Sequence, residues 1–478
     1  MVELARIEGA DEAQVAALAR MLAATARPGQ TILLDGNVGA GKTHFARAFI
    51  RARQDDAAED VPSPTFTLVQ TYLDAKGVEI WHADLYRLTD GSELDELGLL
   101  DAMADGICLI EWPDRMETVP PAALWMSLRP GTSPDLRDIT LQGDPSHWPD
   151  LRRSVERVAM VVASGWTDAG IEVLAGDASA RRYFRLRHEG ESAVLMDDAP
   201  PGSTAAYLAM TDWLRSRGFS APEVLAAEPH AGLLLLEDLG DDLVARVIET
   251  DPTLAQPIYA RIIDLLVDLA QHAPPDFVTK LDGSALADLV AMFAEWYPKA
   301  AGVDPARAAG IAPLIAQLYD QLAGDAPLVL SLRDFHAENL IWRGEAPLGI
   351  LDFQDAVAAH PAYDLVSALQ DARRDVDEAL EAEMIARHVA ATGSDPDRFA
   401  AIYALLGVQR GLRIMGIFTR LAVRDGKARY LDFMPRVWEY IQRDLRHPAM
   451  APLAIVMCAI PAPTVDIIQT ITAKAPVR

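Results

Sequence analysis

The stretch "GNVGAGKT", Gly36–Thr43, fits the pattern G-x-x-x-x-G-K-[ST] of a loop that cradles phosphate groups. It follows the apolar run "TILLD" and opens the helix-like run "THFARAFI", the context that such a loop requires. Its backbone wraps a phosphate, its lysine reaches the terminal phosphates, and its threonine hydroxyl ligates Mg²⁺, so ATP and Mg²⁺ are the predicted cofactors. The predicted nucleotide-binding residues of this loop are Gly36, Asn37, Val38, Gly39, Ala40, Gly41, Lys42 and Thr43.

Two acids stand where this loop needs them. Hydrolysis of ATP requires acidic groups near the metal ion and the attacking water. Glu111 ends the apolar run "ICLIE", and Asp84 ends "EIWHAD". Because parallel strands deliver their C-terminal residues to one edge of a sheet, we predict that both acids lie beside the loop. Both are candidate catalytic residues, and Glu111 with Thr43 is a candidate metal ligand.

A second motif of a different design follows nearly three hundred residues later, in "SLRDFHAENLIW", Ser331–Trp342. Asp334 is placed to accept the proton of a substrate hydroxyl, and Asn339 to hold Mg²⁺ from the same loop. Asp352, after the apolar run "PLGIL", is a candidate second metal ligand. Each motif carries its own acids, so the sequence predicts two separate nucleotide sites.

The residues upstream of this second motif agree with it. The runs "IEVLAG", "YFRLRH" and "SAVLMDD" predict three successive strands joined by tight turns. The first turn, with Gly176 and Ser179, is placed to cover nucleotide phosphates. The strand "GLLLLEDLGD" is a predicted hinge between two lobes, and the backbone of Glu237 to Leu239 is placed to pair with adenine.

Composition limits the partners and the compartment. The chain has 478 residues, with 43 Lys+Arg against 70 Asp+Glu and a formal charge of −27. So negative a surface repels phosphate backbones, and little direct nucleic-acid binding is expected. Two cysteines without metal-ligand spacing, no secretory signal, and no apolar run long enough to span a bilayer predict a cytoplasmic protein without a membrane association.

The chain is too long for one ordinary core. Residues 1–145 read as an α/β domain, and residues 146–153 as a linker. A β-rich lobe and a longer helical region over 154–450 follow, and residues 451–478 are a C-terminal tail. The predicted fold is therefore an α/β P-loop NTPase domain followed by an α+β protein-kinase-like domain, with a small β-rich lobe and a larger helical lobe.

Four motifs in the first domain carry a family resemblance: "GNVGAGKT", "VPSPTFTLVQTY", "HADLYRL" and "IEWPDR", in this order. This set resembles the TsaE family of ATPases, which act in bacterial synthesis of threonylcarbamoyladenosine on tRNA. The resemblance implies metal-binding, catalytic and nucleotide-neighbouring roles for Thr43, Asp84, Glu111 and Trp112. It places Ser63–Thr65 in a mobile loop near the phosphates. It also implies TsaB- and TsaD-like protein partners.

The second region resembles the aminoglycoside-phosphotransferase-like kinases, and most closely the AmgK group of cell-wall amino-sugar kinases. The motifs are "AGDASARRYFRL", "LLLLEDLGD", "SLRDFHAENLIW", "ILDFQDA" and "HPAYDLVSALQDARR". The resemblance implies ATP-dependent phosphorylation of the anomeric hydroxyl of N-acetylmuramate or N-acetylglucosamine in peptidoglycan recycling. Asp334 would be the base, with Asn339 and Asp352 on Mg²⁺, while Asp364 holds the loop.

Two positions depart from this pattern. Leu332 stands where the family often has His, and Met196 lies in the strand "SAVLMDD" where it often has Lys. A missing Lys removes a fixed charge from the phosphates, which leaves a pseudokinase as an alternative. Arg181 or Arg182 is a candidate substitute for that charge.

Acceptor selection must come from the helical lobe. An aromatic ring against a sugar face and an arginine for a carboxylate would suit N-acetylmuramate. The candidates are Glu295, Trp296, Tyr297, Arg373 and Arg413. Alternatives remain at this point: an aminoglycoside or small-alcohol kinase, a P-loop domain that regulates the kinase, and a second lobe that serves only as a binding scaffold. His336 is either a structural or a functional residue of the loop.

Overall fold

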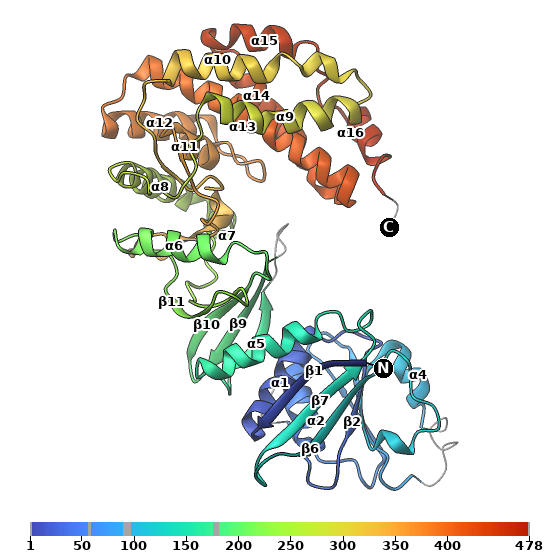
Figure 1. Cartoon of the computed structure of the whole chain (residues 1–478). Coiled ribbons are helices and arrows are strands. Elements are labelled where there is room, and N and C mark those ends of the chain that lie inside the picture. The colour runs from blue at the N-terminus through green and yellow to red at the C-terminus, as the bar shows by residue number, and fades with distance from the viewer. Residues whose placement is uncertain (1, 56–58, 89–96, 175–180, 477–478) are drawn as a thin grey trace. The chain divides into compact units, whose positions relative to one another are not determined.

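The computed structural model describes residues 2–55, 59–88, 97–174 and 181–476. These residues form two compact units, coloured by position in Figure 1. The first unit is Met1–Ala205 with Glu223–Asp238, and the second is Ala206–Pro222 with Leu239–Arg478. The chain passes from the first unit to the second twice, between Ala205 and Ala206 and again between Asp238 and Leu239, within the predicted hinge.

A seven-stranded sheet with strand order β1-β7-β6-β2-β5-β4-β3 forms the centre of the N-terminal part. Strands β6, β2, β5 and β4 run parallel, and the outer pairs are antiparallel. The strands are β1 (Val2–Ala10), β2 (Thr31–Asp35), β3 (Val69–Leu73), β4 (Glu79–Asp84), β5 (Ile107–Glu111), β6 (Leu124–Pro130) and β7 (Arg137–Gly143). The three apolar runs named around the phosphate loop form β2, β4 and β5, and β1 and β3 are the two edge strands.

The helices of this N-terminal part are α1 (Glu12–Thr25), α2 (Lys42–Gln54) and α4 (Leu99–Asp105). Asp11 begins α1 with a capping box, in which its carboxylate accepts from the Gln14 amide and the Gln14 side chain accepts from the Asp11 amide. The phosphate-loop motif joins the central strand β2 to α2. Gly41 there has φ 103°, a conformation that favours glycine.

The small lobe is a five-stranded antiparallel sheet in the order β11-β12-β10-β9-β8. Its strands are β8 (Gly170–Leu174), β9 (Arg182–His188), β10 (Glu191–Asp197), β11 (Val224–Glu228) and β12 (Leu233–Glu237). The three predicted successive strands are β8 to β10, and the predicted hinge strand is β12.

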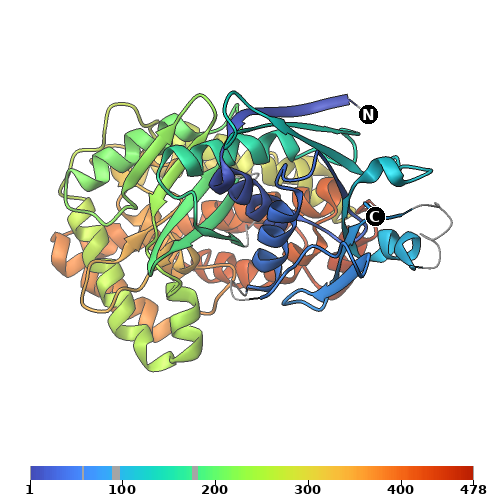
Figure 2. The ribbon, with the colours of Figure 1, turned by 90° about the horizontal axis from the view of Figure 1, so that it is seen from below.

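Helix α5 (Leu151–Ala163) begins inside the segment 146–153 that the sequence predicts as a linker. It lies beside α1 (Figure 2), and its buried Leu151 and Val158 share one apolar core with α1 and with strands of the small lobe. The same helix carries Arg157, fully buried, which pairs with Asp197 of β10 at 2.6 Å. An apolar and charged pattern at helix spacing explains why this segment is helical rather than extended. The predicted domain limits themselves stay a prediction.

The second unit is mostly helical (Figure 1). Its helices are α6 (Thr204–Arg215, whose first two residues belong to the first unit), α7 (Val244–Thr250), α8 (Ala255–Leu269), α9 (Gly283–Ala300), α10 (Ile311–Ala323), α11 (Ala362–Leu369), α12 (Glu378–Thr392), α13 (Pro396–Asp425), α14 (Met434–Asp444), α15 (Ala451–Met457) and α16 (Val465–Thr472). Its short strands are β13 (Val329–Ser331), β14 (Leu340–Ile341), β15 (Gly349–Ile350) and β16 (Val357–Ala359).

Helix α13 is the central helix of this unit. By length and composition it is the one helix in the described part of the chain that is apolar enough to cross a membrane, and 83% of its apolar window is buried inside the structure. A Cβ at Gly416 would lie 2.6 Å from the backbone of Phe293, so glycine allows α9 to approach α13 closely. These observations identify α13 as a core helix of the lobe.

The predicted C-terminal tail, 451–478, contains α15 and α16 in its described part. Helix α15 contacts α10, and α16 contacts α13. Lys474 donates to the carbonyl oxygens of Lys299 and Ala300, at 3.0 and 2.7 Å, at the C-terminal end of α9. This segment is therefore packed against the helical lobe.

Candidate active sites

The phosphate loop holds its own lysine. Lys42 Nζ donates to the carbonyl oxygens of Gly36 and Asn37, at 2.8 and 3.0 Å. Burial lowers the pKa of Lys42, although the nearby carboxylates of Glu111 and Asp84 oppose this effect. Lys42 Nζ also lies 3.9 Å from the ring centroid of Trp112. The loop therefore presents a buried cation beside an aromatic ring.

Glu111 lies in the middle of a short polar chain. Its Oε1 accepts from the hydroxyl of Thr43 at 2.7 Å and lies 3.0 Å from Nε2 of His82. His82, on β4, is fully buried. The sequence predicted Thr43 and Glu111 together, but it did not predict His82. A histidine two positions before Asp84 on the same strand points to the same face, and that alternation was the available signal.

Asp84 is oriented by the loop 63–65. Its Oδ2 accepts from Ser63 Oγ at 2.8 Å and from Thr65 Oγ1 at 2.6 Å, and its Oδ1 accepts from the Tyr86 amide at 3.0 Å. Strands β4 and β5 are parallel, with Asp84 directly opposite Glu111. The structure thus brings the two predicted acids together at one edge of the sheet, next to the loop that the sequence placed there.

Trp112 has φ 61°, an unusual left-handed conformation for a bulky residue. Its ring lies 5.0 Å from that of Tyr86, centroid to centroid. The strained backbone turns the ring directly after β5 ends, so that it meets Lys42. The conformation and the Lys42 contact distinguish Trp112 from a residue of a regular strand end, and its predicted role beside the nucleotide stays a prediction.

In the second unit, the loop after β13 joins Asp334 to Asn339. Asn339 Nδ2 donates to the carbonyl oxygen of Asp334 at 2.8 Å, and the amide of Leu351 donates to the carbonyl oxygen of Asn339 at 2.9 Å. Asp352 follows with φ 56°, and Gln354 Nε2 donates to its Oδ1 at 3.1 Å. The hairpin β14–β15 therefore brings the three predicted residues into one region.

Asp364 of α11 accepts hydrogen bonds from the start of this loop. Its carboxylate accepts from Ser331 Oγ at 2.7 Å, from the Leu332 amide at 2.6 Å and from the Arg333 amide at 3.0 Å. Complete burial raises the pKa of Asp364 to about 6, against these hydrogen bonds. Its contacts agree with the predicted role of a loop-holding residue.

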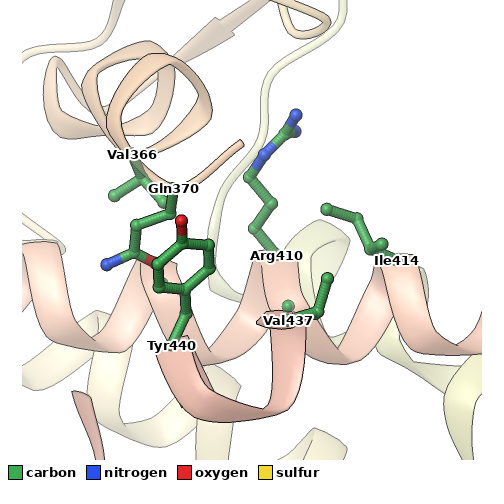
Figure 3. Close-up of a pocket in the computed structure, with 8 residues that line it drawn as sticks. Val366, Gln370, Arg410, Ile414, Val437 and Tyr440 are labelled. Carbon is green, nitrogen blue, oxygen red and sulfur yellow. The ribbon is translucent and has the colours of Figure 1, made fainter. Parts of the chain in front are cut away.

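Arg410 of α13 reaches the same loop from another side, and the sequence analysis did not single it out. It is buried, and its Nη1 donates to the carbonyl oxygen of Arg333 at 3.2 Å. Figure 3 shows its side chain rising from α13 beside a small pocket lined by Gln370 and Tyr440. Arg333 itself has φ 70°, so contacts on both faces hold a strained peptide directly before Asp334.

Charges around Asp334 favour its ionised form. Burial alone would raise its pKa, but the guanidinium groups of Arg410, and then of Arg413 and Arg333, hold the pKa of Asp334 below its ordinary value. Burial lowers the pKa of His336 and so favours the neutral imidazole. Within the described residues, His336 Nδ1 is buried without a hydrogen-bond partner. An ionised carboxylate suits a group that accepts a proton.

Other positions predicted to contact the nucleotide belong to the small lobe and the hinge. Gly176 and Ser179 lie outside the described residues. The Glu237 amide donates to the Glu223 carbonyl oxygen at 2.8 Å, and the side chain of Leu239 lies against Gly349. Met196 is fully buried in β10, and Arg182 pairs with Asp150 at 2.5 Å.

The acceptor candidates separate into two groups. Tyr297 is buried, stacks on Phe293, and donates its hydroxyl to the Pro461 carbonyl oxygen at 2.9 Å, so it is a core residue. Glu295 is exposed and Trp296 is partly buried on the same helix. Arg413, by contrast, is partly buried and close enough to act on Asp334, and Arg373 acts on His336 in the same way.

The two sites define a fusion of a P-loop ATPase with a phosphotransferase of the protein-kinase-like class. The family model "Threonylcarbamoyl adenosine biosynthesis protein TsaE" matches residues 9–137, and "Phosphotransferase enzyme family" matches residues 170–402. The chain belongs to the N-acetylmuramate/N-acetylglucosamine kinase family through its larger part, and to the TsaE family through its N-terminal part. The predicted fusion, fold class and enzymatic class are thereby confirmed.

Three relatives show how far the likeness extends. The N-acetylmuramate/N-acetylglucosamine kinase of Caulobacter vibrioides is 41% identical over 348 residues, 63% of this chain and 94% of that protein. The protein of the same name from Pseudomonas putida is 33% identical over 315 residues, 63% of this chain and 91% of its own. The TsaE protein of Bacillus subtilis is 37% identical over 125 residues, 26% of this chain and 76% of that protein.

Proposed function

We propose that the larger part of the chain transfers the γ-phosphate of ATP to the anomeric hydroxyl of N-acetylmuramate or N-acetylglucosamine. The similarity to N-acetylmuramate/N-acetylglucosamine kinases supports these acceptors. The observation that carries the proposal is the conformation of the loop from Ser331 to Asn339. The side chain of Asn339 donates to the carbonyl oxygen of Asp334, and Asp364 accepts from the Leu332 amide. The product would enter peptidoglycan recycling.

In this proposal Asp334 accepts the proton of the sugar hydroxyl as it attacks. The cationic side chains around Asp334 keep it ionised and ready to accept that proton. Arg410 and Asp364 hold the carbonyl oxygen and the amide of Arg333, the residue directly before Asp334, so that the carboxylate does not need to reorganise during the reaction. The main contribution of the chain is therefore orientation.

The residues present suit Mg²⁺. Asn339 donates its amide nitrogen to the backbone, which leaves its amide oxygen for a cation, and Asp352 supplies a carboxylate. Among the described residues no three His, Cys, Asp or Glu side chains gather as a metal cage, and Mg²⁺ is ordinarily bound by one or two protein oxygens together with substrate phosphates. Bound Mg²⁺ would neutralise charge on those phosphates.

The N-terminal site is proposed to hydrolyse ATP in support of tRNA threonylcarbamoyladenosine formation, with TsaB- and TsaD-like partners. Lys42 and the loop amides would hold the phosphates, and Thr43 with Glu111 would hold Mg²⁺. Asp84 would orient the attacking water. The hydrogen bond that already joins Thr43 to Glu111 supports this assignment. A net charge of −27 is consistent with partners that contact the tRNA, and a cytoplasmic location follows from both reactions.

The experiment is incubation of the purified chain with ATP and N-acetylmuramate, followed by assay for an acid-labile 1-phosphate. N-acetylglucosamine, galactose and an aminoglycoside serve as comparison acceptors. We expect product from the two amino sugars, none from Asp334→Ala, and an unchanged yield from Lys42→Ala. No product from either amino sugar would refute the proposed kinase, and preferential phosphorylation of the aminoglycoside would favour an antibiotic kinase.

A further inference from the structure

Cationic side chains gather around the catalytic loop of the helical lobe, in a chain whose formal charge is −27. Arg410, Arg413 and Arg333 all act electrostatically on Asp334, and Arg373 acts on the neighbouring His336. Asp334 and Asp371 supply part of the compensating negative charge, and an anionic ligand would supply more. Magnesium-bound ATP would supply negative charge only where the phosphate donor binds, and not where the acceptor sugar binds.

Two of these arginines, Arg410 and Arg413, lie on one helix and differ in their hydrogen-bond partners. Arg410 and Arg413 are three positions apart on α13 and therefore share one helix face. Arg410 is occupied, because its Nη1 donates to the Arg333 carbonyl oxygen at 3.2 Å. Within the described part of the chain, no hydrogen bond or ion pair engages Arg413, which is only partly buried.

A guanidinium group presents a planar fork of N–H donors that matches a carboxylate. The two acceptors named for similar kinases differ in charge, since N-acetylmuramate carries a lactyl carboxylate and N-acetylglucosamine does not. A partly exposed arginine without a partner beside the catalytic aspartate is the group that would distinguish them.

We propose that Arg413 is a specificity-determining residue that binds the carboxylate of an anionic acceptor, while Arg410, one turn earlier on α13, positions the catalytic loop. This inference rests on the proposed amino-sugar kinase activity. It assigns separate consequences to two arginines of one helix: Arg413 governs acceptor binding, and Arg410 governs turnover.

The test measures kcat and KM at saturating ATP for three acceptors: N-acetylmuramate, its methyl ester and N-acetylglucosamine. We expect Arg413→Met to raise KM for N-acetylmuramate roughly 10- to 100-fold, the value of a charge-assisted hydrogen bond, and to change KM for both uncharged acceptors less than about twofold. Arg413→Lys should restore part of the preference. Arg410→Met should lower kcat about tenfold for all three acceptors alike.

Arg424→Met is the matched control, because Arg424 lies on the same helix, is exposed and pairs with its neighbour Asp425 at 2.7 Å. It should leave every constant unchanged. An equal effect of Arg413→Met on charged and uncharged acceptors, or no effect, would overturn the inference. If Arg413→Met does not fold, the lysine variant gives the same comparison. A wild-type chain inactive on all three sugars would instead refute the proposed function.

Discussion

The two nucleotide sites of this chain are constructed in different ways. At the P-loop, the residues that would surround the phosphates are consecutive, and a glycine with φ 103° shapes the turn. At the kinase loop, Asp334 depends on buried side chains 31 to 77 positions away from the peptide that they hold. A local motif therefore suffices for the phosphate loop itself, and its acids come from the ends of β4 and β5, while the second site requires that α11 and α13 are already packed.

This contrast implies different sensitivities. The P-loop site should respond mainly to changes in its own residues and in the adjacent strand ends. The kinase site should also respond to changes deep in the helical lobe, where Asp364 and Arg410 contact the loop main chain. Since each site has its own acids, loss of one activity should leave the other in place.

The largest effect is expected from removing each site's principal residue in turn. Asp334→Asn should lower sugar phosphorylation by about 10³-fold or more, because it removes the proton acceptor. Lys42→Ala should lower P-loop ATP turnover to a similar extent. Each variant is assayed for both reactions, with the TsaB- and TsaD-like partners present for the second. A loss of both activities in either variant would mean that the sites are coupled.

Asp364→Ala tests the dependence of the kinase loop on distant packing. It leaves the buried Leu332 amide and the Ser331 hydroxyl without their acceptor, and it removes one of the two acceptors of the Arg333 amide. We expect a loss of roughly 3 kcal/mol in the free energy of unfolding, together with loss of sugar phosphorylation. Denaturant titration measures the first and the coupled assay the second. Asp276→Ala, at an exposed position, is the control, and equal stability of the two variants would contradict the prediction.

His82→Ala tests whether the P-loop site also depends on a buried neighbour. Loss of the contact at Glu111 Oε1 should lower P-loop ATP turnover about tenfold, since supporting groups around metal ligands ordinarily contribute that much. Nucleotide binding, followed with a fluorescent ATP analogue, should change little. His147→Ala, exposed on the same domain, is the control. Unchanged turnover would show that the P-loop site is wholly local.

The smallest effect concerns pH. Asp444 of α14 is buried beside Glu381 and Gln370, and burial raises its pKa to about 8. The folded chain keeps this proton where the unfolded chain releases it, so the stability that it contributes is present at low pH and is lost as pH rises through about 8. Asp444→Asn should remove this loss.

Between pH 7 and pH 9, the stability of Asp444→Asn should therefore improve relative to wild type, by about 1–2 kcal/mol. Thermal unfolding at several pH values measures the difference. Arg443, which pairs with Glu381 in the same cluster, stays unchanged in the variant. A difference between the two proteins that is independent of pH would contradict the raised pKa.

Local pattern was enough to predict the P-loop, its two acids and the strand-helix order around it, because these depend on backbone conformation and strand register. The Asp334–Asn339–Asp352 set was also predicted, since its spacing is short. His82 and Arg410 were missed, because neither lies in a spacing that marks a site by itself. The segment at α5 was predicted as a linker up to 153, because its proline-rich start conceals the helical pattern that begins at Leu151.

The sequence by itself determined that this chain carries two phosphate-handling motifs, in two kinds of fold, with the side chains that each chemistry needs. Only the tertiary structure decided which distant groups hold those side chains. Asp364 and Arg410 contact the main chain of the kinase loop, and Arg157 of α5 lies buried against Asp197. The physical reason is that motif geometry is a property of neighbouring residues, whereas burial and electrostatic surroundings arise only when remote segments pack together.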